Sequence, residues 1–214
     1  MTAPIDCILV LMILTNFLLL GSSRLLGCIK TAAFQGILVA LLPVVVTGSN
    51  LTFRLIAICI TIAALKGFVF PHLLSTNLRS SNTSREVQPL VGYTTSIVVG
   101  VLSLAISFWL DSKLLLPIGS NSQLVVPVAF SMMFTGLFLI IARRTAINQV
   151  LGYLILEDGI YSFGFAIVGD IPVLIELGVL MDLFVAVFVM GIAIYRISRE
   201  FDHIDSEQLN SLKD

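Results

Sequence analysis

The sequence predicts an all-α, polytopic membrane protein of about seven transmembrane helices. Hydrophobic residues make up 57% of the 214 positions and charged residues only 12%, whereas soluble domains carry about 25% charged residues. The mean hydropathy is +1.05. Long apolar stretches alternate with short polar turns along the whole chain. Together these features favour a chain that lies mostly in a lipid bilayer.

Each predicted helix is an apolar stretch of about 20 residues, the length needed to cross a hydrocarbon core of about 30 Å. Short turn or charge signals such as GSSR, TGSN and GDIP separate the stretches. The first stretch follows MTAPID, which has an acid and no basic residue, so we expect a retained helix rather than a signal peptide. The longest polar stretch, 75–86, is expected to be a loop or a short surface helix. The seven predicted helices are 4–20, 29–47, 53–75, 89–110, 124–142, 147–168 and 173–196.

The placement of basic residues predicts the orientation. Seven helices put nine basic residues on one side of the membrane and two, Arg54 and Lys113, on the other. The N-terminus is therefore expected outside and the C-terminus in the cytoplasm, in a cell inner membrane. The nine are Arg24, Lys30, Arg79, Arg85, Arg143, Arg144, Arg196, Arg199 and Lys213.

Several functional classes have no support in the sequence. The net charge of −1 offers no basic surface for nucleic acid. The cysteines Cys7, Cys28 and Cys59 lie apart in apolar stretches without metal-ligand spacing, so we expect no metal. No nucleotide-binding, hydrolase or haem-ligating motif is present. We therefore expect neither a cofactor nor a catalytic site in this chain.

Among the charged residues within predicted helices, five are candidates for function: Lys66, Glu157, Asp158, Glu176 and Asp182. An unpaired charge at the centre of a bilayer costs about 2.5–3.5 kcal/mol on insertion scales, and helices can pack with Ser, Thr or Gly instead. These residues therefore predict a polar pathway inside the bundle that exchanges protons.

Each of these residues also has a structural interpretation. Lys66 can form a static ion pair or bond carbonyls freed by Pro71. Glu176 is close to the outer end of its helix and can be interfacial. Asp158 points about 100° away from Glu157 on a helix and can face another side of the pathway or a neighbouring subunit.

The run ARRTAINQVLGYLILEDGIYSFG, followed by DIPVLIELGVLMDLFVAVFVMGIAI, resembles component E of the hydrogenase-4 and formate hydrogenlyase family. The most specific features are the Arg143–Arg144 pair, then Gly152 and Tyr153 before Glu157, then Asp182. Lys66 before Pro71 matches a further feature of this family. Residues 124–196 also resemble the three-helix complex I subunit called NuoK and its Mrp antiporter counterpart.

The resemblance implies roles for two acids. In the complex I subunit, two membrane glutamates on successive helices belong to the proton-transfer axis. Asp182 matches the second glutamate with a side chain one methylene shorter. Glu157 matches the first with a shift of about one turn, and positions three apart still share a helix face.

The resemblance further implies a non-redox membrane subunit of a complex I-like assembly, of the group 4 nickel–iron hydrogenase type. Its partners would be antiporter-like and junction subunits in the membrane, and peripheral hydrogenase and iron–sulfur subunits. A structural scaffold and a stand-alone secondary transporter are the alternatives. The implied units are an N-terminal three-helix unit with its loop (1–88), a fourth helix with its outer loop (89–123), a NuoK-like unit (124–196) and a cytoplasmic tail (197–214).

Overall fold

A computed structural model of the chain describes residues 3–47, 53–80, 91–114, 123–143, 145–167 and Gly178. Every secondary-structure element in this part of the chain is a helix, and the predicted all-α class is confirmed. The helices are α1 (Ala3–Gly21), α2 (Leu25–Thr47), α3 (Phe53–Ala64), the π-helical segment η1 (Leu65–Val69), α4 (Phe70–Ser80), α5 (Tyr93–Lys113), α6 (Val125–Ala142) and α7 (Ala146–Ile167).

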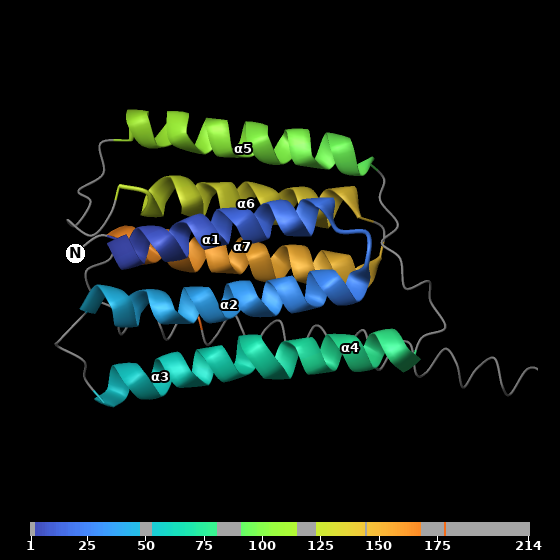
Figure 1. The fold of residues 1–214 in the computed structure, drawn as a ribbon, viewed down its shortest axis with the longest axis horizontal. Helices are drawn as coiled ribbons and strands as arrows, with labels where there is room; N and C mark the ends of the chain where they lie inside the picture. The colour runs from blue at the N-terminus through green and yellow to red at the C-terminus, as the bar shows by residue number, and fades with distance from the viewer. Residues whose placement is uncertain are drawn as a thin grey trace, which may run out of the picture.

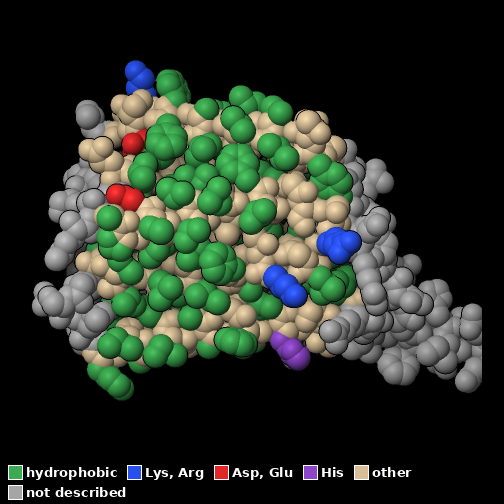
Figure 2. All heavy atoms as spheres, in the orientation of Figure 1, with side chains coloured by type: hydrophobic (Ala, Val, Ile, Leu, Met, Phe, Trp, Pro, Cys, Tyr) green, Lys and Arg blue, Asp and Glu red, His purple; other side chains and the backbone are tan. Residues whose placement is uncertain are grey.

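Five stretches are long and apolar enough to cross a membrane: Ala3–Gly21, Leu25–Val46, Leu55–Thr76, Tyr93–Lys113 and Val125–Ala142. Large hydrophobic side chains are exposed on several helices, including Leu18 on α1 and Trp109 on α5. Figure 2 shows that hydrophobic side chains cover most of the face in view and that charged ones are few. The chain is a multi-pass membrane protein.

The helices run side by side with their axes nearly aligned (Figure 1). The helices α1, α2, α6 and α7 form the middle of the bundle, and α5 packs on α1 and α6. On the opposite side α3, η1 and α4 form one continuous rod that packs along α2. The core between the middle helices contains fully buried Leu9, Met12, Leu20, Met132 and Ile155.

Three glycines allow α6 and α7 to approach closely and antiparallel. A Cβ atom on Gly136 would lie 2.5 Å from the backbone nitrogen of Leu156. A Cβ on Gly152 would lie 2.8 Å from the carbonyl oxygen of Gly136, and one on Gly159 would lie 2.8 Å from the nitrogen of Met133. Because these contacts are with backbone atoms, the helix pair has no room for a side chain at these positions.

The third predicted helix, 53–75, is longer and less regular in the structure. The helix continues through Ser80, into the polar stretch expected to be a loop or a short surface helix. Its middle, Leu65–Val69, is π-helical: the backbone N–H of Phe70 bonds to the carbonyl oxygen of Leu65, five residues back. Pro71 follows just after the π segment, inside the continuous rod, where it has no N–H to bond to the preceding turn. This π segment carries Lys66.

Other predicted boundaries shift by a few residues. The second helix begins at Leu25 instead of 29, so Lys30 lies in the second turn of α2. The fourth begins at Tyr93 instead of 89 and ends at Lys113. The predicted seventh helix, 173–196, lies outside the described residues apart from Gly178.

Candidate functional site: a buried charge cluster

Lys66 lies on the buried side of the α3–η1–α4 rod, and its side chain is only 7% exposed. Its Nζ atom lies 3.0 Å from Oε1 of Glu157 and 2.7 Å from Oδ1 of Asp158. Both acids are on α7 and each is 2% exposed. We call Lys66, Glu157 and Asp158 the charge cluster. An ammonium group has three donors, so one lysine can bond both carboxylates at once.

Both acids lie near the middle of α7, which spans Ala146–Ile167. Consecutive side chains on a helix diverge by about 100°. The two carboxylates nevertheless meet the same ammonium, because the lysine comes from a neighbouring rod and reaches α7 between them. Asp158 therefore belongs to the same site as Glu157 within the described part of the chain.

Close contact with α2 positions the lysine. A Cβ atom on Gly36 would lie 2.6 Å from Cβ of Lys66, so the glycine lets the stem of the lysine pass against the α2 backbone. A Cβ on the next residue of η1, Gly67, would lie 2.9 Å from Cδ1 of Ile37. The rod and α2 are therefore packed tightly at this level, and the ammonium is directed toward α7.

Further polar groups surround the acids on α7. Tyr153, one turn before Glu157, is close enough to interact electrostatically with both Glu157 and Lys66. Ser162 donates a hydrogen bond from its hydroxyl to the backbone carbonyl of Asp158 at 2.8 Å. One turn beyond Glu157, the buried ring of Tyr161 lies beside Gly178, where a Cβ atom would be 3.2 Å from the ring. The cluster thus has further polar groups close to it on α7.

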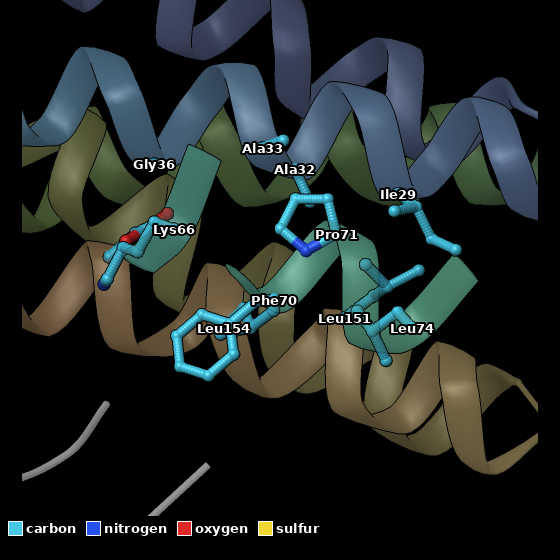
Figure 3. A pocket seen from close by; sticks show the side chains of 11 residues that line it. Ile29, Ala32, Ala33, Gly36, Lys66, Phe70, Pro71, Leu74, Leu151 and Leu154 are labelled. Carbon is cyan, nitrogen blue, oxygen red and sulfur yellow. The ribbon is translucent and has the colours of Figure 1, made fainter. Parts of the chain in front are cut away.

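A small cavity adjoins the cluster between α2, the rod and α7 (Figure 3). Its volume is about 10 Å³. In Figure 3 Lys66 and Gly36 are at one end, and Leu74 and Ile29 at the other. Asp158 also lines the cavity, and apart from these charged groups the lining is apolar.

The structure unites three of the five site residues that the sequence indicates. Lys66, Glu157 and Asp158 form one cluster, while Glu176 and Asp182 lie outside the described residues. The structural interpretation of Lys66 as an ion-pair partner agrees with this geometry, and so does membership of a polar pathway. The arrangement can hold and release protons, because burial disfavours each charge while the opposite charge stabilises it.

Sequence reasoning missed a second buried polar contact. Gln35 on α2 donates a hydrogen bond from Nε2 to Oδ1 of Asn16 on α1 at 3.0 Å, and both side chains are buried. The remaining amide atoms, Nδ2 of Asn16 and Oε1 of Gln35, are buried and have no hydrogen-bond partner among the described residues. The signal in the sequence was the presence of amide side chains within apolar helices. This signal is weaker than a charged residue, because burial of an amide costs less free energy than burial of a charge.

Arg143, from the predicted arginine pair, is buried at the end of α6. Its Nη2 atom donates to the carbonyl oxygen of Leu20 at 3.2 Å, at the end of α1. Its guanidinium also lies 5.4 Å from the centroid of the Tyr93 ring at the start of α5. The arginine therefore joins three helices at one end of the bundle.

An apolar helix bundle with an ammonium and two carboxylates buried between its helices defines a multi-pass membrane protein with an intramembrane charge cluster. Residues 124–214, which include α6 and α7, match the sequence profile of the family described as NADH-ubiquinone/plastoquinone oxidoreductase chain 4L. This match confirms the expected resemblance of the C-terminal part to the complex I subunit.

Known proteins extend the similarity to most of the chain. Hydrogenase-4 component E of Escherichia coli is 24% identical over 148 residues, which are 69% of this chain and 68% of the relative. The protein of the same name from Shigella flexneri matches to the same extent. An uncharacterized protein of Mycobacterium tuberculosis is 28% identical over 95% of this chain and 93% of its own length. No solved structure matches significantly. The chain is thus homologous to hydrogenase-4 component E, as its motifs indicate.

Proposed function

We propose that the chain is a non-redox membrane subunit of a complex I-like hydrogenase assembly, in which the charge cluster transfers protons. The names of its relatives support a membrane subunit of this class. The observation that carries the proton-transfer role is the cluster itself: an ammonium within 3.0 Å of two carboxylates, all almost completely buried in an apolar bundle.

The cluster suits proton transfer because its protonation depends on nearby charge. Two carboxylates share one ammonium, so a change of charge beside any of the three alters how strongly the other two hold a proton. Redox chemistry in partner subunits would supply such a change, and Glu176 and Asp182 would continue the pathway. In this proposal the N-terminus is outside, the C-terminus is cytoplasmic and the membrane is the inner membrane.

The domain organisation follows the same proposal. Residues 124–196 would form the unit shared with the complex I subunit, and residues 1–88 the unit that supplies Lys66. The fourth helix with its outer loop (89–123) and the tail (197–214) would complete the chain. Neighbouring subunits would include antiporter-like and junction subunits, with peripheral hydrogenase and iron–sulfur subunits beyond them.

The test is proton movement by the intact assembly in membrane vesicles. Glu157→Gln and Asp158→Asn keep side-chain size but remove the exchangeable proton, so we expect each to reduce the redox-driven pH gradient severalfold. Electron transfer measured with the same vesicles gives the coupling ratio. Asp111→Asn, in the last turn of α5, is the matched control and should leave that ratio unchanged.

A purely structural role is the second candidate, because a buried ion pair also specifies which helices pack together. Blue-native electrophoresis distinguishes the structural role from proton transfer, because it measures how much complex is assembled. If the carboxamide variants reduce the amount of assembled complex but the complex that remains is still coupled, the cluster is structural. Full coupling in both variants, with assembly intact, would refute proton transfer through these acids.

A further inference from the structure

The charge cluster contains one more acid than base. Lys66 contributes one positive charge, and Glu157 and Asp158 would contribute two negative charges if both were ionised. All three side chains are at most 7% exposed. An uncompensated charge in apolar surroundings is so costly that the group neutralises instead. A neutral cluster therefore requires one proton on one of the two carboxylates, in addition to the protons of the ammonium.

Among the described helices, those beside α7 bring no second cation to the acids. The helix α6 has no ionisable residue, and Lys30, the one basic residue of α2, is exposed. In the rod, His72 is exposed, and the arginines Arg54 and Arg79 are near its two ends. The sequence has no lysine or arginine from position 145 to position 195. The second acid of the cluster is therefore compensated by a proton and not by another base.

The two contacts of the ammonium differ in length. Nζ of Lys66 lies 2.7 Å from Asp158, within the range of about 2.7–2.9 Å that is typical of a bond between an ammonium and a carboxylate. It lies 3.0 Å from Glu157, and about 2.9–3.0 Å is the commonest length of N–H···O bonds in general. The small cavity is lined by Lys66 and Asp158 but not by Glu157, so room for one solvating water is beside Asp158. Both features favour Asp158 as the ionised partner of Lys66.

Glu157 has phenol groups on its own face of α7. Tyr153 precedes it and Tyr161 follows it by four residues, and positions four apart are neighbours on a helix surface. The ring of Tyr161 is buried, and Tyr153 interacts electrostatically with Glu157. A phenol is uncharged at neutral pH and can donate a hydrogen bond to a carboxyl group or accept one from it. These neighbours can accommodate a protonated Glu157 without adding a charge.

We infer that the resting cluster stores one proton: Lys66 and Asp158 form a permanent ion pair, and Glu157 is the neutral acid beside them. The exchange of this proton rests on the proposed function, whereas its presence at rest follows from charge balance. Loss of the proton from Glu157 would leave one net negative charge in the cluster. Release therefore requires a positive charge to approach, and Glu157 binds a proton again when that charge leaves. Asp158 keeps the ammonium charged and in place, but does not carry the exchanged proton.

Infrared spectroscopy of the full chain in lipid vesicles at neutral pH counts protonated carboxyl groups, because a protonated carboxyl has a C=O stretching band that a carboxylate lacks. Glu157→Gln should remove the absorption of one carboxyl. Asp158→Asn should remove the same absorption, because Glu157 then ionises as the remaining counter-ion of Lys66. Lys66→Met should instead add the absorption of one carboxyl. The matched control Lys30→Met, at an exposed lysine, should change nothing.

Isotope labels identify which acid carries the proton. The band lost in Glu157→Gln should shift in the unaltered chain when the carboxyl carbons of glutamate are labelled, and should stay in place when those of aspartate are labelled. A shift with labelled aspartate alone would exchange the roles of Glu157 and Asp158 and would overturn the assignment. Either carboxamide variant serves as the reference spectrum, so this result does not depend on whether Lys66→Met folds.

Two other results would overturn the charge balance. If neither carboxamide variant loses a carboxyl absorption, both acids are ionised beside the lysine at rest. If only Asp158→Asn retains the absorption, the proton on Glu157 does not depend on the Lys66–Asp158 ion pair. The spectra are separate from the coupling assay in vesicles. Intact coupling in Glu157→Gln would refute proton transfer by the cluster, yet the infrared band would still show whether a proton is stored there.

Discussion

Removal of the ammonium from the charge cluster is the most informative perturbation of this protein. Lys66→Met keeps most of the apolar stem that passes Gly36, but it removes the group that lies 3.0 Å from Glu157 and 2.7 Å from Asp158. Two carboxylates, each 2% exposed, then remain together without the lysine. Loss of one partner from a buried ion pair costs about 3–5 kcal/mol.

The expected shift in melting temperature follows from this free energy. For chains of about 150–250 residues, 1 kcal/mol changes the melting temperature by about 2–4 °C, so Lys66→Met should melt roughly 6–20 °C lower. Cys28 and Cys59 are buried free thiols. Once the exposed Cys7 has reacted, a thiol-reactive fluorophore therefore reports unfolding in detergent without any engineered probe.

The matched control is Lys30→Met. Lys30 lies on α2 but is exposed, so the same change there should alter stability by no more than about 0.5 kcal/mol. Comparison of the two variants separates the loss of a buried charge from the loss of a lysine as such.

Asp158→Asn tests the electrostatic reasoning, because the sign of its effect on the melting temperature should depend on whether Lys66 is present. In the unaltered chain, Asp158→Asn removes one partner of the ammonium and should be neutral or destabilising. In the Lys66→Met background it removes one of two buried acids that have lost their counter-charge and must take up a proton to stay buried, so it should raise the melting temperature. Equal melting of Lys66→Met and Lys30→Met, or further destabilisation of Lys66→Met by Asp158→Asn, would refute the cluster as the source of stability.

Two further predictions concern packing and orientation. Gly152→Ala should destabilise the α6–α7 pair by about 1–3 kcal/mol, because the added Cβ would lie 2.8 Å from a carbonyl oxygen of α6. The control in the same thiol-unfolding assay is Gly92→Ala, because no atom of the described residues, apart from the glycine and its chain neighbours, lies within 4 Å of the Cβ position at Gly92. A reporter fused after residue 214 should be active only if the reporter functions in the cytoplasm, and activity of a periplasm-dependent reporter at that position would reverse the predicted orientation.

The helices were predictable because membrane insertion imposes length and apolarity on the sequence itself. The ends of the helices were less predictable: the second helix begins at Leu25, four residues before its predicted start at 29. The π segment at Leu65–Val69 had no sequence signal beyond the nearby Pro71. The π segment lies where the rod packs on α2. A single sequence does not show this packing.

The members of the cluster were predictable, but their pairing was not. Lys66 and Glu157 were identified as functional candidates because charged residues within apolar stretches are costly to bury. Their contact joins positions 91 residues apart, and the 100° divergence of Glu157 and Asp158 argued against a common partner. A long lysine stem that crosses Gly36 overcomes that divergence. Gly36 makes this contact possible, but it has no functional group. A search of the sequence for ionisable side chains therefore did not identify it.

The acids of the charge cluster lie in the part of the chain that matches the chain 4L family, and its lysine lies outside that part. The chain 4L match covers 124–214 and so includes Glu157 and Asp158, but not Lys66 or Gly36. The acids therefore lie on a helix of the type shared with that family, and the N-terminal helices contribute the ammonium that bonds them. Because burial in an apolar bundle disfavours a carboxylate without a counter-charge, the N-terminal part supplies the group that favours the charged form of these acids. Substitutions at Gly36, whose Cβ position lies 2.6 Å from Cβ of Lys66, should consequently disturb the acids of α7 by displacing their ammonium partner.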